Sequence, residues 1–216
     1  AGIDIIAENS LCNYVFNPLI NIVVSALIIL GGIGYIVWWD VVRVIKNHSF
    51  KAKGFFKKLT LHSKIAITVT LALVFGGAVL IFAFEYSTPQ TMRDYTLLQK
   101  IGASFFQSVT TRTAGFATVP QENLSNASAM VSLLLMFIGG SPVGTAGGVK
   151  TVTFAVIFAT ALATVGKKDD TELFGRQLTK QAIGKASAVV CISFAIMFFS
   201  TVLLSAVTDA SAIDVI

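Results

Sequence analysis

The sequence has little charge, little cysteine and little histidine. Charged residues make up 12% of its 216 residues, against about 25% in an average soluble domain. The two cysteines, Cys12 and Cys191, form no metal-binding or disulfide pattern, and His48 and His62 lie in a basic segment without ligand spacing. These shortages argue against a disulfide scaffold and a metalloenzyme, and we expect no enzyme activity.

Apolar residues are abundant instead. They make up 55% of the chain, and the mean hydropathy is +0.79. A helix of about 20 residues crosses about 30 Å of hydrocarbon. Runs long enough to cross in this way predict an all-α, multi-pass membrane protein, and we interpret the long third run as one broken helix. The apolar runs are Leu19–Val42, Ile65–Phe84, Ser128–Val165 and Ala186–Val207.

The cationic residues gather in two linkers, residues 43–64 and 167–185. Together these segments hold 12 of the 16 Lys and Arg residues. Short basic loops stay on the cytoplasmic side of a membrane, so both linkers are predicted to face the cytoplasm, with Trp38 and Trp39 at the inner interface. Orientation explains this charge more simply than nucleic-acid binding, and we expect no nucleic-acid partner.

Between the two linkers the chain must cross the membrane outward and return. Residues 65–84 lead out and residues 128–165 lead back, but the intervening Leu97–Val109 is apolar with a helical rhythm. It is too short to span a bilayer. We therefore predict a short re-entrant helix followed by a turn that contains glycine.

An internal repeat supports this reading. The start "AGIDIIAENSL…LIILGG" resembles the later "AGFATVPQENL…LMFIGG", so that Gly2 matches Gly115 and Gly31 matches Gly139. In this alignment Ala1 and Gly2 are the end of a turn whose short helix is missing. We therefore expect the chain to be a piece of a longer protein.

The turn "TTRTAGF", residues 110–116, is the strongest candidate for chemistry. The C-terminal dipole of a re-entrant helix favours a cation, and the carbonyl groups of the residues that follow can replace its hydration shell. A glycine at positive φ allows the carbonyl direction to alternate. The alternative is a tight turn that only packs against neighbouring helices. The candidate ligands are the backbone carbonyls of Thr113, Ala114 and Gly115, with Ala1 and Gly2 as their repeat equivalents.

Arg112 within this turn carries a charge beside a proposed cation path. A buried charge in a membrane is costly and is normally paired. We expect its side chain to point away from the path toward an acidic residue, without a choice among the three candidates. These are Glu85, Asp94 and Glu122.

The segment "GGSPVGTAGGVKT", residues 139–151, interrupts the third apolar run. It is not a phosphate-binding loop, because Val149 separates Gly148 from Lys150 where G-x-x-x-x-G-K-[ST] requires Gly-Lys. Irregular backbone at membrane depth is tolerated where it lines water or is buried in protein, so a movable gate is the favoured interpretation and a rigid kink at Pro142 is the alternative. The equivalent "GGIGYIVWW" is expected to run straight through. The candidate gate residues are Gly139, Gly140, Ser141, Pro142, Gly144, Thr145, Gly147, Gly148 and Lys150.

Four stretches together resemble the Trk/Ktr/HKT superfamily of cation transporters, in particular the Ktr-type potassium-uptake subunit: "AGID", "LIILGGIGYIV", "FFQSVTTRTAGF" and "MFIGGSPVGTAGGVKT". The resemblance covers nearly the whole chain. It implies M1–pore-loop–M2 repeats around a central ion pore, with filter glycines at Gly2 and Gly115 and an intramembrane gate at residues 139–150. It also implies a homodimer in contact with lipid and with a cytosolic nucleotide-binding regulatory ring.

On this basis we expect uptake of K⁺, with Na⁺ as the other candidate, by passive flow or symport across the plasma membrane. The rival functions are a broken-helix transporter for a small solute and a non-conducting membrane scaffold. The first and fourth filters of the family have no counterpart in the chain. The predicted segments are 1–46 (filter end and M2 of a second repeat), 47–64 (linker), 65–166 (third repeat), 167–185 (linker) and 186–216 (M1 of a fourth repeat).

Overall fold

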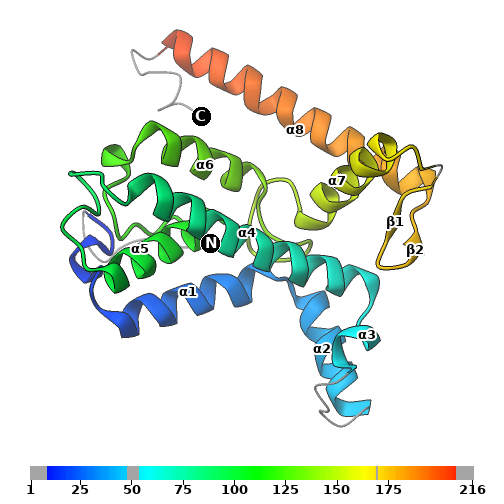
Figure 1. Cartoon of the computed structure of the whole chain (residues 1–216). Helices are drawn as coiled ribbons and strands as arrows, with labels where there is room; N and C mark the ends of the chain where they lie inside the picture. Colours follow the sequence, from blue (N-terminus) through cyan, green and yellow to red (C-terminus); the bar gives the residue numbers. More distant parts are fainter. Residues whose placement is uncertain (1–8, 48–53, 169, 208–216) are drawn as a thin grey trace. The chain divides into compact units, whose positions relative to one another are not determined.

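A computed structural model of the chain describes residues 9–47, 54–168 and 170–207 (Figure 1). The chain divides into two compact units, residues 1–152 and 153–216. Ala1 and Gly2 lie outside the described residues, as does His48.

The first unit is built from helices joined by short connections. Its longest helix, α4 (Leu61–Glu85), packs against α5 and α6 (Figure 1). The five larger helices are α1 (Pro18–Gly32), α2 (Tyr35–Asn47), α4, α5 (Leu97–Thr110) and α6 (Asn126–Phe137). Shorter helical turns are η1 (Cys12–Tyr14), α3 (Phe55–Lys58) and η2 (Gln121–Asn123).

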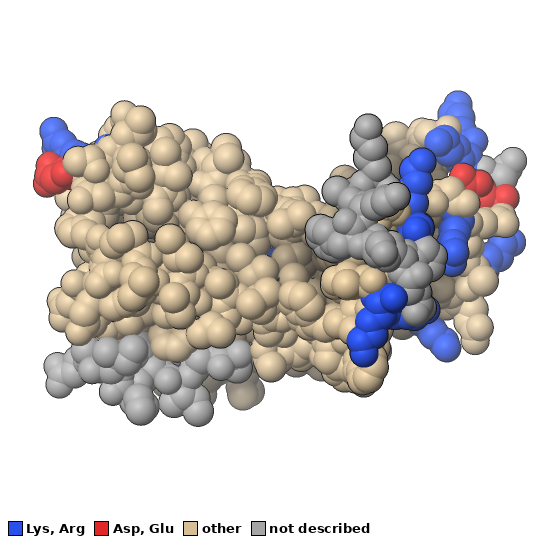
Figure 2. Space-filling model, turned by 90° about the horizontal axis from the view of Figure 1, so that it is seen from below, with Lys and Arg blue, Asp and Glu red and all other residues tan. Residues whose placement is uncertain are grey.

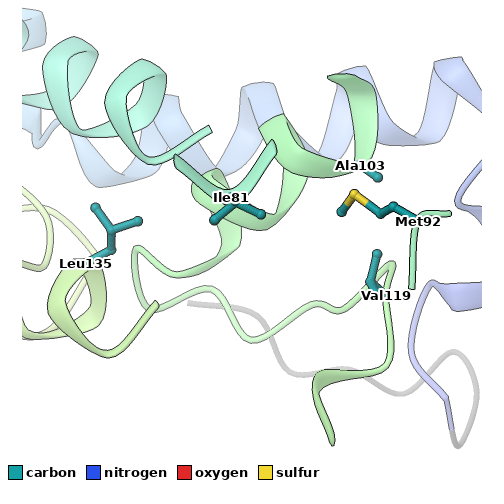
Figure 3. Close-up of a cluster of buried hydrophobic side chains, with 5 residues drawn as sticks. All are labelled: Ile81, Met92, Ala103, Val119 and Leu135. Atoms are coloured by element: carbon teal, nitrogen blue, oxygen red, sulfur yellow. The ribbon is translucent and has the colours of Figure 1, made fainter. Parts of the chain in front are cut away.

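A cluster of buried apolar side chains joins these helices. Ile81 of α4, Ala103 of α5 and Leu135 of α6 contribute to it, together with Met92 and Val119 from the connecting segments (Figure 3). Lipid tails are as apolar as these side chains, so close packing, more than transfer out of water, stabilises such a cluster in a membrane. The cluster fixes α5 and the segment after it against α4.

The predicted short helix is present as α5. It spans 14 residues, within one residue of the predicted end, and most of its second half is buried. At its start the side chain of Gln99 accepts a hydrogen bond from the backbone N–H of Thr96. At 14 residues and about 1.5 Å per residue the helix is about 21 Å long, too short to cross the hydrocarbon.

The prediction that the second-repeat segment runs straight is wrong. The helix stops at Gly32, restarts at Tyr35, and the two halves meet at an angle of 91° (Figure 1). Gly34 has φ +87°, a left-handed conformation that is incompatible with a continuing right-handed helix. The segment is therefore a second broken helix.

Two buried carboxylates hold the starts of later helices. Asp40 of α2 accepts hydrogen bonds from Arg43 and from the backbone N–H of Thr60, the N-cap residue of α4 (2.7 Å). Glu85 of α4 accepts from the N–H and hydroxyl of Ser125, the N-cap residue of α6 (2.8 and 2.7 Å). Each acid thus connects one helix to the start of another, and its charge is satisfied as burial requires.

The second unit contains most of α7 (Thr151–Val165), a short hairpin and α8 (Lys180–Val207). The hairpin strands, β1 (Glu172–Leu173) and β2 (Arg176–Gln177), were not predicted. By length and composition α4 and α8 could each cross a membrane, and the bent α1–α2 pair would make a third span among the described residues. The chain is an all-α membrane protein, as predicted.

Candidate functional site

The turn after α5 has an alternating backbone. Thr113 has φ +61° and Gly115 has φ +86°, with Ala114 between them. The positive φ at Gly115 was expected, whereas Thr113 was not, because a β-branched residue is a rare outlier there. Alternation of this kind changes the direction of successive carbonyl groups along the turn.

The turn is anchored at both ends and open in its middle. The N–H of Ala114 donates to the carbonyl of Thr110 (3.1 Å), and the hydroxyl of Thr110 donates to the carbonyl of Phe116. Among the described residues, no hydrogen bond ends on the carbonyl oxygens of Thr113, Ala114 or Gly115. These three oxygens are thus available to a ligand.

A cavity of about 550 Å³ opens beside this turn. Residues Thr113 to Ala117 line one part of it, and Ser132 and Met136 of α6 line another. The hydroxyl of Ser132 is buried and has no partner among the described residues. The cavity next to the turn is therefore lined by polar groups of the turn and by one face of α6.

Ser10 and Leu11, which belong to the predicted second repeat, lie against the same turn. The N–H of Leu11 donates to the carbonyl of Ala117 (2.9 Å), and the N–H of Ala117 donates to the hydroxyl of Ser10 (2.9 Å). Ser10 and Leu11 follow shortly after Gly2, the repeat equivalent of Gly115. Ala117 follows two residues after Gly115, so the two related stretches of chain are neighbours.

Arg112 does not pair with any of the three acids predicted for it. Its guanidinium is buried and donates to the carbonyl of Gly139 (3.1 Å). The carboxylate of Glu85 accepts hydrogen bonds from Thr91 and Ser125. The one ion pair among the described residues joins Arg43 to Asp40. The prediction is wrong: Nη2 of Arg112 donates to a backbone carbonyl of the glycine-rich segment, and Nη1 is buried without a hydrogen-bond partner among the described residues.

The third apolar run is broken, as predicted, and residues 138–150 form a closed loop between α6 and α7. Within the loop the N–H of Gly140 donates to the carbonyl of Gly147 (3.3 Å), and the N–H of Thr151 donates to the carbonyl of Gly140 (3.1 Å). Lys150 donates to the carbonyl of Ala146 (2.7 Å). An extended loop replaces the single kink at Pro142 that was the alternative.

The loop contacts the turn directly. The N–H of Gly147 donates to the hydroxyl of Thr113 (2.8 Å), and Arg112 reaches Gly139 at the other side of the loop. The carbonyl groups of Gly31 and Gly32 accept hydrogen bonds from the loop as well. Sequence reasoning missed this last contact, although "GGIG" after a long apolar run could have indicated a break in the helix.

Comparison with known proteins identifies the family of the chain. The family described as TrkH, cation transport protein, matches residues 1–216. The chain belongs to this family. Its members are cation transporters and not enzymes, as predicted.

Individual members of the TrkH family are similar over nearly the whole chain. The "Ktr system potassium uptake protein B" of Bacillus subtilis is 36% identical over 216 residues, which are 100% of this chain and 46% of that protein. The "potassium/sodium uptake protein NtpJ" of Enterococcus hirae is 34% identical over 205 residues, 95% of this chain and 43% of that protein. The chain thus spans less than half the length of these relatives.

A solved structure shows the same fold. The crystal structure of the potassium transporter TrkH from Vibrio parahaemolyticus has a TM-score of 0.62 and 16% sequence identity, and covers 93% of this chain and 40% of that chain. The predicted Trk/Ktr resemblance is therefore confirmed at the level of family and fold.

Proposed function

We propose that this chain forms part of a transporter that takes K⁺ into the cell, with Na⁺ as the second candidate, through a filter of backbone carbonyl groups. The observation that carries the proposal is the row of carbonyl groups of Thr113, Ala114 and Gly115, which accept no hydrogen bond among the described residues and whose two outer residues have positive φ. Carbonyl oxygens can replace the hydration shell of a monovalent cation. The names of the relatives, which include both potassium and sodium uptake, are consistent with this choice of ions.

The helix before the turn supports the same proposal. The C-terminus of α5 leads directly into the turn, so its dipole places partial negative charge beside the carbonyl row. Ala1 and Gly2 would supply the equivalent groups from the second repeat. The remaining filters would come from parts of the full-length protein that this chain does not contain.

Residues 138–150 are proposed as the gate of this path. The loop contacts the filter turn through Thr113 and Arg112, and it contains five glycines, Gly139, Gly140, Gly144, Gly147 and Gly148. Glycine-rich backbone can change conformation at little steric cost. Such a loop beneath a filter can block or release an ion without moving the helices that hold the filter.

The assembly is also a proposal. The full-length protein would reside in the plasma membrane as a homodimer, with a cytosolic nucleotide-binding ring at the inner face. Much of the face seen in Figure 2 carries neither Lys or Arg nor Asp or Glu. A surface with so little charge supports a membrane setting, and the basic linkers in the sequence support a cytoplasmic inner face.

The filter proposal is tested by comparing two left-handed glycines in the full-length transporter. Gly115→Ala strains the filter turn (φ +86°), whereas Gly175→Ala imposes similar strain on the β1–β2 hairpin (φ +71°). Strain of about 1–3 kcal/mol at the ion site should lower K⁺ uptake by about fivefold to a hundredfold. K⁺-dependent growth and ⁸⁶Rb⁺ uptake of an uptake-deficient host measure this effect, and the Gly175→Ala variant should retain uptake.

Equal uptake by the two variants at equal expression would contradict the filter. Absence of uptake in the unmodified full-length protein would favour the scaffold function instead.

The gate proposal has its own test. Shortening residues 139–150 in the full-length transporter should raise the ion flux, because the barrier below the filter is removed. Flux into proteoliposomes measures the change at matched protein content. Unchanged or lower flux in a correctly folded variant would argue against a gate.

A further inference from the structure

Two broken helices meet at one place in the first unit. A helix leaves its last carbonyl groups without partners inside the helix. At the end of α1 the carbonyl of Gly32 accepts from the N–H of Ser141 (2.9 Å), and the carbonyl of Gly31 accepts from the N–H of Thr145 (3.4 Å). The gate loop thus caps the C-terminus of α1 with its own backbone.

Glycine makes this contact close enough to form. A Cβ atom on Gly34 would lie 2.4 Å from the carbonyl oxygen of Pro142, and one on Gly144 would lie 2.9 Å from the carbonyl oxygen of Gly32. Real Cβ atoms do not approach backbone this closely. By contrast, a Cβ atom on Gly32 would meet nothing within 4 Å. The two backbones therefore require glycine at the contact and not beside it.

We propose that the break between α1 and α2, residues 31–35, is the docking site of the gate loop, and that the loop closes by placing its amides on the last carbonyls of α1. The functional consequence rests on the proposed gate role of residues 138–150. The docking site itself stands on the hydrogen bonds and glycine contacts alone. It gives the second repeat a defined part in closing a gate that belongs to the third.

The contact also links the gate loop to α2. The N–H of Tyr35, the first residue of α2, donates to the carbonyl of Val143 (3.4 Å), and the indole of Trp38 donates to the carbonyl of Leu30 (3.0 Å). Further along α2, Asp40 holds the backbone of Thr60 at the start of α4. A change in the angle between α1 and α2 would therefore alter the hydrogen bonds that hold the docked loop. In this proposal, α2 transmits a movement of the basic linker to the gate loop.

Hydrogen–deuterium exchange of the full-length transporter tests the docking site. Two variants place a Cβ atom in the contact from opposite sides, Gly34→Ala and Gly144→Ala. Two matched controls add the same atom where space allows, Gly32→Ala and Gly147→Ala, whose Cβ would lie 3.8 Å from its nearest neighbour, the Cγ2 atom of Thr113. Amides that lose their partners exchange faster through local opening. Peptides covering residues 139–151 should exchange about tenfold or more faster in the two test variants and at the unmodified rate in the controls.

Peptides from α4 serve as the measure of correct folding in every variant. If Gly34→Ala disrupts α4, the Gly144→Ala variant, which leaves the α1–α2 bend unaltered, decides the question. Exchange in residues 139–151 that is equal in folded test and control variants would overturn the docking site. Ion flux is recorded in parallel: faster exchange with unchanged flux would support the docking site and count against the gate role alone.

Discussion

The second and third repeats contain the same glycine pair and use it in opposite ways. In the second repeat Gly31 and Gly32 end α1, and the chain resumes as α2 after two residues. In the third repeat the equivalent Gly139 and Gly140 open a loop that lasts until Thr151. The first break presents carbonyl oxygens, and the second supplies the amides that bind them.

This difference shows how a repeat can diverge without losing its architecture. Each broken helix leaves backbone groups without partners, which is costly inside a membrane. Here each break supplies hydrogen-bond partners for some of the unpaired backbone groups of the other. The Gly31–Gly32 pair that ends α1 is therefore also one side of a contact with the loop of the other repeat.

The largest effect is expected from alanine at the third-repeat glycine. A Cβ atom on Gly139 would lie 1.7 Å from the carbonyl oxygen of Gly147, whereas one on Gly31 would lie 3.2 Å from the side-chain oxygen of Thr145, a much milder approach. Gly139→Ala should cost about 3 kcal/mol or more, and Gly31→Ala less than about 1 kcal/mol. Apparent unfolding temperatures of the full-length protein in detergent measure both. A similar drop in unfolding temperature for both variants would contradict the inference that Gly139 lies in a closer backbone contact than Gly31.

A smaller effect is expected at the starts of the two M2 helices, which are also held differently. The start of α6 depends on the remote Glu85, which is fully buried. Glu85→Gln would place an amide N–H₂ against donors, and should cost about 1.5–3 kcal/mol because charged hydrogen bonds are lost. The exposed Glu122→Gln is the control and should leave the unfolding temperature unchanged.

The smallest effect of this series belongs to the start of α1. Its cap is local: the side chain of Asn17 accepts from the N–H groups of Leu19 and Ile20 (3.1 and 3.3 Å). Asn17→Ala should cost about 1 kcal/mol, the usual loss for a helix cap. A loss at Asn17 as large as that at Glu85 would show that α1 depends on more than its own cap.

Much of the fold could be predicted from the sequence because its signals are local. Apolar length predicted α4 and α8, and apolar rhythm predicted α5. The position of a glycine in the turn predicted the left-handed φ of Gly115. The internal repeat and the four quoted motifs predicted the family from the sequence alone, without knowledge of any contact between distant residues.

What could not be predicted depends on contacts between distant residues. The break at Gly34 is accompanied by contacts with a loop more than a hundred residues later, and the local sequence "GGIG" gives no sign of those contacts. The partner of Arg112 is a backbone carbonyl, which no pattern of side chains can indicate. The left-handed φ of Thr113 contradicts local preference and is held by its surroundings.

Thr113 has a consequence for how long such a pathway can stay conducting. Its peptide is under strain, and its side-chain oxygen is tied to Gly147 of the loop. If residues 138–150 are the gate proposed above, their withdrawal would remove that hydrogen bond, and a rotation of the strained peptide would then relieve the strain and turn its carbonyl oxygen. Under the proposed filter role, opening would weaken the ion-selecting turn, and the turn itself would limit the time spent open.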